Sequence, residues 1–89
     1  MLYVTSARYL RGYKIRIAFS NGEAGVVDLD DALWGPVFEP LKDLRAFKRF
    51  RVSDVLHTIS WDNGADFAPE FLYDKMLEQA HVPEMAASS

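Results

Sequence analysis

The sequence predicts an α+β fold, with a small, mainly antiparallel sheet built from β-hairpins and two helices packed on one face. Three observations lead to this fold class. Polar and apolar residues alternate over residues 13–20, as in a strand with one buried face. Asn-Gly pairs at 21–22 and 63–64 are typical of hairpin turns. Pro40 and Pro69 each open a segment with apolar residues at helical spacing.

Length and composition are those of a single small domain. The chain has 89 residues, of which 49% are hydrophobic and 13% aromatic, so a packed core is expected. We expect one compact domain over residues 1–82 and a loose tail over residues 83–89. The absence of cysteine excludes disulfides, thiolate metal sites and thiol nucleophiles. No stretch approaches the ~20 apolar residues of a membrane span, and no signal peptide opens the chain, so a cytoplasmic protein without membrane contact is expected.

Charge is distributed unevenly along the chain. The formal net charge is −3. Residues 1–53 carry nine basic and six acidic side chains, whereas residues 54–89 carry one basic and seven acidic side chains. The acidic total argues against general nucleic-acid binding, but the basic first half keeps a local anion-binding surface open.

The first elements are a strand near Leu2–Tyr9, a break at Gly12, and a hairpin. In the second strand Ile15, Ile17 and Phe19 face one side, while Lys14, Arg16 and Ala18 face the other. With a two-residue Asn-Gly loop, Phe19 is expected opposite Ala24 and Ile17 opposite Val26, which places the apolar side chains on one face.

The middle of the chain predicts a short turn, a helix and another strand. Asp30 or Asp31 caps a turn that Gly35-Pro36 ends. A helix is expected over Leu41–Phe50, with apolar residues every three positions. A strand then places Val55, His57, Ile59 and Trp61 on one side. The last helix begins at Pro69, points Leu72, Met76 and Leu77 inward, and ends at Pro83.

Several of these segments, taken in order, resemble a known family. They are Phe19–Gly22, Asp28-Leu29, Phe38–Leu41, Trp61–Asp66 and Pro69–Tyr73. Over about Tyr3–Leu77 the chain resembles the small bacterial proteins grouped as domain of unknown function 2442. The resemblance implies a compact α+β domain with no assigned activity. It also implies a small neighbouring protein as partner, as in toxin–antitoxin-like gene pairs.

Few residues are candidates for chemistry. Asp62 and Asp66, with Glu70 one helical turn on, could gather around a divalent cation, but their spacing does not match a calcium loop. His57 could act as a general base only beside a nucleophile and an orienting acid. Turn formation and packing explain these residue types better, so no catalytic residue, metal or cofactor is expected.

Binding residues are easier to nominate. The expected helix over 41–50 carries a basic stripe, and Trp34 stands beside the Gly35-Pro36 turn as an anchor for a partner. The stripe consists of Lys42, Arg45, Lys48 and Arg49, followed by Arg51.

We therefore expect a non-enzymatic protein-interaction module of the bacterial cytosol, with a small protein partner or a second copy of itself. One alternative is a small metal-dependent hydrolase that uses His57, Asp62 and Asp66. A weaker alternative is nucleic-acid binding through the basic face between Lys42 and Arg51, which the acidic total disfavours.

Overall fold

The computed structural model describes residues 1–88, and the side chains of residues 1–80. Strands β1 (Val4–Arg11), β2 (Lys14–Phe19) and β3 (Ala24–Asp28) form one antiparallel sheet in that spatial order. Two 3₁₀ turns, η1 (Asp30–Ala32) and η2 (Glu39–Lys42), lead to the one-turn helix α1 (Leu44–Phe47). Strands β4 (Arg51–Val52) and β5 (Ile59–Ser60) form a second sheet, and helix α2 spans Pro69–Ser88. The predicted α+β class is confirmed.

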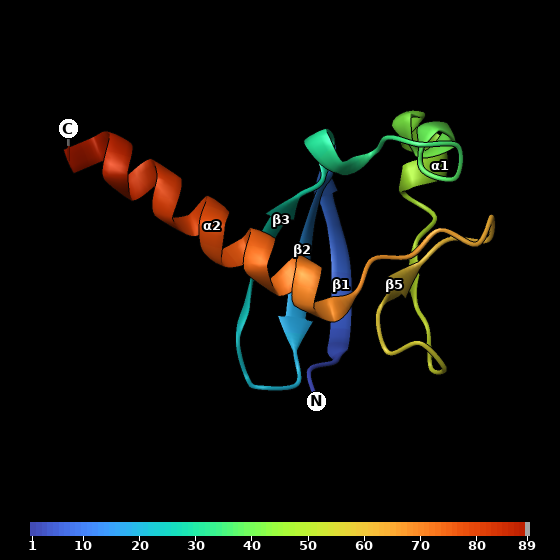
Figure 1. The fold of residues 1–89 in the computed structure, drawn as a ribbon, viewed down its shortest axis with the longest axis horizontal. Helices are drawn as coiled ribbons and strands as arrows, with labels where there is room; N and C mark the ends of the chain where they lie inside the picture. The colour runs from blue at the N-terminus through green and yellow to red at the C-terminus, as the bar shows by residue number, and fades with distance from the viewer. Residues whose placement is uncertain (89) are drawn as a thin grey trace.

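One face of the three-stranded sheet is covered and the other is open. Figure 1 shows α2 running diagonally across the front of the sheet, with α1 and the small sheet beside β1. The core lies under these elements and includes Ile15, Ile17, Val27, Phe47, Ile59 and Leu72, each of which is fully buried. Within the described part of the chain, no helix has the length and apolar character that a membrane crossing requires.

The hairpin between β2 and β3 exists, but its register differs by one residue from the prediction. Ala24 pairs with Ala18 and Val26 with Arg16, not with Phe19 and Ile17. The amide of Phe19 donates to the carbonyl of Glu23 (2.8 Å), so the loop holds three residues. Gly22 supplies the positive φ (+89°) that such a loop needs. The shift puts Gly25 and Val27 on the covered face and leaves Val26 on the open face.

The helix predicted over Leu41–Phe50 is broken at Asp43. Asp43 has an extended backbone (φ −73°, ψ 117°), and its carboxylate accepts from the amide of Arg45 (2.9 Å). This N-cap ends η2 and starts α1 afresh, so the helical repeat is interrupted after Lys42. The new start turns Phe47 into the core, where its carbonyl accepts from the Trp61 indole (2.9 Å).

The strand predicted over residues 55–61 is also wrong in its first half. Ser53 Oγ accepts from the amides of Val55 and Leu56, and the amide of His57 donates to the Ser53 carbonyl (2.8 Å). This local bonding closes a tight loop that competes with strand pairing. Val55 is consequently 84% exposed, and His57 has a left-handed backbone (φ +57°).

Helix α2 contacts β3 through one face. Leu72 and Met76 are buried, as predicted, whereas Leu77 is partly exposed. The helix continues through Pro83, where the sequence predicts its end. An interior proline lacks the amide that would bond to the carbonyl four residues earlier, and its ring crowds that carbonyl, which is why the sequence indicates an end at this position. A loose tail is expected over residues 83–89. The side chains of these residues, and the backbone of residue 89, lie outside the described part of the chain.

Candidate binding surfaces

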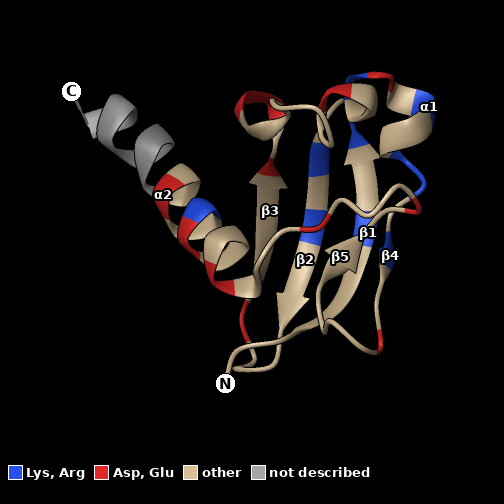
Figure 2. Cartoon of the chain, turned by 45° about the vertical axis from the view of Figure 1, so that its right-hand side comes forward, with Lys and Arg blue, Asp and Glu red and all other residues tan. Residues whose placement is uncertain are grey.

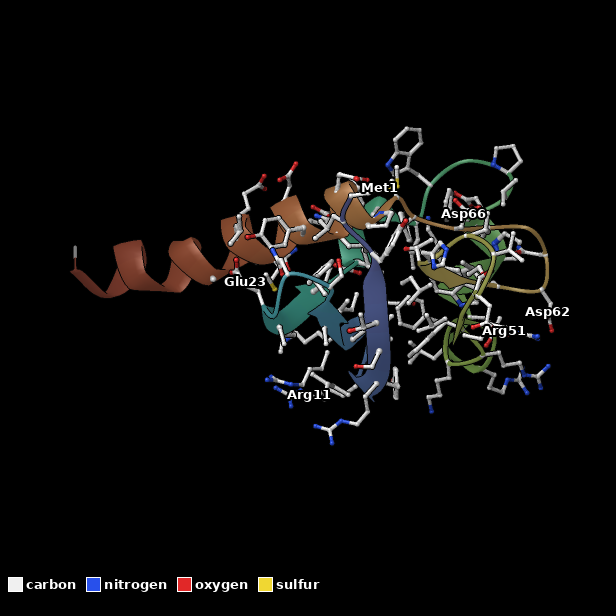
Figure 3. All side chains as sticks on the ribbon, turned by 90° about the horizontal axis from the view of Figure 1, so that it is seen from below. Met1, Arg11, Glu23, Arg51, Asp62 and Asp66 are labelled. Carbon is white, nitrogen blue, oxygen red and sulfur yellow. The ribbon has the colours of Figure 1, made fainter. Side chains whose placement is uncertain are left out.

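The residues of the hydrolase alternative do not meet in one cleft. His57 is exposed in the loop before β5 and stacks on the Tyr3 ring, with centroids 4.2 Å apart. The Asp62 carboxylate forms an exposed ion pair with the Arg51 guanidinium, and Asp66 lies elsewhere on the same turn (Figure 3). A general base needs a substrate or nucleophile within hydrogen-bond reach, together with an orienting acid. The three side chains do not provide that arrangement.

The turn between β5 and α2 is built by backbone geometry. Asn63 Oδ1 accepts from the amide of Ala65 (3.0 Å), and the Gly64 amide donates to the Trp61 carbonyl (3.0 Å). Gly64 has φ +92°. Among the described residues, no three acidic or histidine side chains lie close enough to hold a metal ion. Asn63 and Gly64 thus make the chain reversal, whereas Asp62 pairs with Arg51 and the backbone of Asp66 forms a β-bridge with Ser60.

The basic stripe predicted on one helix is divided between two elements. Lys42 lies in η2 and pairs with Glu39 (3.3 Å), while Arg45 lies in α1 and pairs with Asp43 (3.5 Å). Hydrogen bonds from the Arg45 amide and guanidinium to the Asp43 carboxylate lower the pKa of that carboxyl. Both cations are thus partly compensated by a neighbouring carboxylate.

The remaining basic residues of this region point to different neighbours. The Lys48 ammonium lies 5.3 Å from the centre of the Tyr9 ring, a cation–π contact. Arg49 is exposed, and Arg51 pairs with Asp62. The region is basic. Because the helix is broken at Asp43 and the cations contact different neighbours, the basic residues do not form the single aligned stripe that a continuous helix would give.

Trp34 stands at the rim of an aromatic hollow. The residue is 73% exposed, and the following Gly35 (φ +91°) turns the chain back toward the body. The hollow has a volume of about 450 Å³. Phe38, Phe67 and Phe71 line it, and their rings stack in sequence at centroid distances of 4.7 and 5.3 Å. The predicted anchor is therefore accompanied by further rings, of which Phe71 is 42% exposed.

The open face of the three-stranded sheet carries basic residues that sequence reasoning did not nominate. Arg8 lies directly opposite Arg16 on neighbouring strands, and Arg11 lies opposite Lys14. Like charges placed directly across a ladder destabilise it. Asp28, opposite Lys14 on β3, is the acidic residue of this face. The ion pairs found among the described residues all involve other cations.

Figure 2 shows how the charged residues are distributed over the elements. Basic segments colour β1 and β2 in Figure 2, and acidic segments follow α2. In Figure 3 the Arg11 side chain extends from the sheet on the side away from α2. A signal for this face is present in the sequence, since Lys14 and Arg16 alternate with Ile15 and Ile17. The positions of Arg8 and Arg11 depend on strand pairing, which the sequence does not show.

Comparisons with known proteins give one family and one structural relative. The family model described as "Protein of unknown function (DUF2442)" matches residues 4–78. The structure of NE0471 from Nitrosomonas europaea ATCC 19718, provisionally named a DNA-binding protein, is similar with a TM-score of 0.79 and 29% sequence identity. The similarity covers 91% of this chain but 52% of that chain, so this chain spans about half the length of NE0471. No curated protein matches significantly.

Proposed function

This chain belongs to the DUF2442 family, and we propose that it is a non-enzymatic domain that binds a protein partner through the surface around Trp34. The observation that carries the proposal is an indole that is 73% exposed beside a hollow lined by phenylalanine rings. Tryptophan side chains that become buried on association dominate the binding energy of many interfaces. The proposed setting is the bacterial cytosol.

The surroundings of Trp34 fit an interface centre with a polar rim. Val37 and Phe71 add partly exposed apolar surface (45% and 42%). Asp31 and Lys75 line the hollow and form an ion pair with each other (2.7 Å), which leaves the central surface apolar. Interfaces commonly combine such an apolar centre with a polar, solvated edge. The partner that fits is a small protein that inserts an apolar side chain beside Trp34.

Replacing Trp34 by alanine is expected to abolish partner capture while preserving the fold. Loss of an interface tryptophan commonly costs 2 kcal/mol or more, equivalent to roughly a 30-fold weaker complex. The measurement is quantitative mass spectrometry of proteins that co-purify with the tagged chain from its native cell, compared between wild type and Trp34→Ala.

Val55→Ala is the matched control, because Val55 is more exposed (84%) and lies in a different loop. It should capture the same partner as the wild type. Equal capture by wild type and Trp34→Ala, or the absence of any partner that depends on Trp34, would contradict the proposal.

A second candidate function is nucleic-acid binding through the open face of the sheet. It is supported by the basic cluster on that face, namely Arg8, Arg11, Lys14 and Arg16, and by the name given to NE0471. Phosphates would relieve the repulsion between the facing cations Arg8 and Arg16. This location differs from the helix face that the sequence predicts.

The double variant Arg8→Gln/Arg16→Gln is expected to weaken DNA binding and flatten its salt dependence. Each lost phosphate contact should lower the slope of log K against log salt by about one. The measurement is fluorescence anisotropy of a labelled DNA duplex over a range of salt concentrations. The same double variant should also be slightly more stable, because a like-charge pair has been removed.

Arg45→Gln/Arg49→Gln is the control with the same change of charge on the helix region. It should retain most of the affinity. No binding by the wild type at low salt would exclude this function. Loss of binding only in the helix variant would assign it to the face between Lys42 and Arg51 instead.

A further inference from the structure

Strand β3 has a free edge whose backbone groups face a groove. It is the last strand of the sheet order β1-β2-β3. The amide of Asp28 donates to Gln79 Oε1 (2.8 Å), and Gln79 Nε2 donates to the Asp28 carbonyl (2.9 Å). The Asp28 backbone therefore points away from β2. Because orientation alternates along a strand, the backbone groups of Ala24 and Val26 face the same side.

Gln79 bonds to Asp28 as a neighbouring strand would, by offering one donor and one acceptor to the same residue. Gln79 reaches only Asp28. Among the side chains described up to residue 80, none bonds to the outward backbone groups of Ala24 and Val26. An exposed row of this kind is a template for a further strand. The remaining free length of the edge runs from Ala24 to Val26.

Helix α2 forms the opposite wall of the groove. Figure 1 shows α2 crossing β3 and lying over its free edge. The absence of a side chain at Gly25 allows this close approach, since a Cβ there would lie 2.7 Å from the Met76 sulfur. Leu77 and Ala80 line the groove beyond Met76, and its volume is about 800 Å³. A strand added to β3 would pack its inward side chains against these apolar residues.

The ends of the groove are acidic. Glu23 precedes β3 at one end and accepts from the Tyr73 hydroxyl (2.6 Å), which raises the pKa of Tyr73. Asp28 and Asp30 lie at the other end. A hydrogen bond from Lys75 lowers the pKa of the nearby Asp31, so that carboxylate already has a cation. Lys14 is the basic residue of the lining.

We propose that β3 accepts an extended segment of a partner protein as a fourth strand of the sheet. The segment has basic residues at its two ends and apolar residues at alternate positions between them. Main-chain hydrogen bonds to Ala24 and Val26 hold it, Leu77 and Ala80 contact its apolar side chains, and the acidic ends bind its cations. Charge selects this occupant over a second copy of the chain. Pairing two β3 edges antiparallel would bring Glu23 of one copy against the aspartates of the other.

The probe is a synthetic acetylated and amidated peptide, Lys-Val-Thr-Val-Thr-Val-Lys, labelled for anisotropy. Its matched controls are the same peptide N-methylated at its three central residues and a version with glutamate in place of both lysines. N-methylation removes strand hydrogen bonding without changing the charge. The wild-type chain should bind the first peptide at least about tenfold more tightly than either control, since about two backbone hydrogen bonds or both end contacts are lost.

Val26→Pro tests the edge directly. Its amide faces away from β2, so proline removes the edge donor without breaking the hairpin ladder. Affinity for the probe should fall at least about tenfold, whereas Val26→Thr, which keeps the amide, should stay within about twofold. Binding should protect the amides of Ala24 and Val26 from hydrogen exchange. Trp34→Ala should leave all of this unchanged, which separates this site from the proposed partner surface.

Thermal unfolding of each variant checks the fold, and Ala24→Pro replaces Val26→Pro if that variant does not fold. The proposal is overturned if the probe does not bind at millimolar concentration, or if N-methylation leaves its affinity unchanged. It is equally overturned if the proline variant binds as the wild type does. A wild-type dimer in sedimentation that Val26→Pro dissociates would assign the edge to self-association instead.

Discussion

Replacing Phe47 by alanine is expected to lower the free energy of unfolding by about 3–5 kcal/mol, the range seen for buried phenylalanines. Phe47 is fully buried, and its ring makes edge contacts with Tyr13 (5.2 Å between centroids) and Tyr9 (6.3 Å). It also packs on Trp61 (5.8 Å). These contacts join α1, the sheet and the turn before α2. Small domains are typically stable by about 5–15 kcal/mol, so the variant should be extensively destabilised.

Urea denaturation followed by Trp61 fluorescence, in a Trp34→Phe background, measures this effect. The background leaves Trp61 as the only tryptophan of the chain. Leu44→Ala is the control, because Leu44 lies in the same one-turn helix but is 38% exposed. It should cost less than about 1 kcal/mol, as expected for a partly exposed site. Similar unfolding midpoints for the two variants would show that Phe47 does not hold these elements together.

The covered face of the sheet is the part of the fold that the sequence predicted best. Ile15, Ile17 and Phe19 are all buried, because alternation with polar residues fixes which side of β2 faces the core. The register of β3 could not be predicted in the same way. Asn-Gly fits loops of two and of three residues, and the choice depends on whether Gly25 or Val26 fits beneath Met76.

Two errors share a cause, namely side chains that bond to their own backbone. Asp43 starts a new helix, and Ser53 closes the loop in which His57 lies. Asp and Ser are common in such positions, yet each also occurs on exposed helix faces and strands. Apolar spacing alone therefore predicted regular elements through both residues. Where a short helix or strand is held by only one or two backbone hydrogen bonds, a single side-chain bond to the backbone can end it. The spacing of apolar residues does not reveal that competition.

The candidate binding surfaces divide along the same line. The exposure of Trp34 follows from a local signal, the Gly35-Pro36 turn beside it. The cation pair of Arg8 and Arg16 and the free edge of β3 are products of strand pairing. Residues far apart in sequence create them, so a single sequence shows the charges or the strand but not their juxtaposition.

Replacing Leu72 by alanine is expected to cost about 2–5 kcal/mol and to loosen α2 from the sheet. Leu72 is fully buried on α2, whereas Leu77, one and a half turns further along the same helix, is 38% exposed. Both substitutions remove the same atoms and keep a good helix former, so helix propensity cancels in the comparison. The measurement is urea denaturation of both variants, together with hydrogen exchange of the β3 amides.

Leu77→Ala should lose less than about 1 kcal/mol of stability, and its β3 amides should exchange at the wild-type rate. Leu72→Ala should also weaken the bonds from Gln79 to Asp28 on β3 and from Tyr73 to Glu23 just before β3, because both depend on where the helix lies. Exchange at Asp28, whose amide bonds to Gln79, should therefore accelerate more than exchange within the β1–β2 ladder. Uniform acceleration would mean that α2 and the sheet unfold as one unit. In that case helix α2, which forms one wall of the groove beside β3, would not open separately from the core.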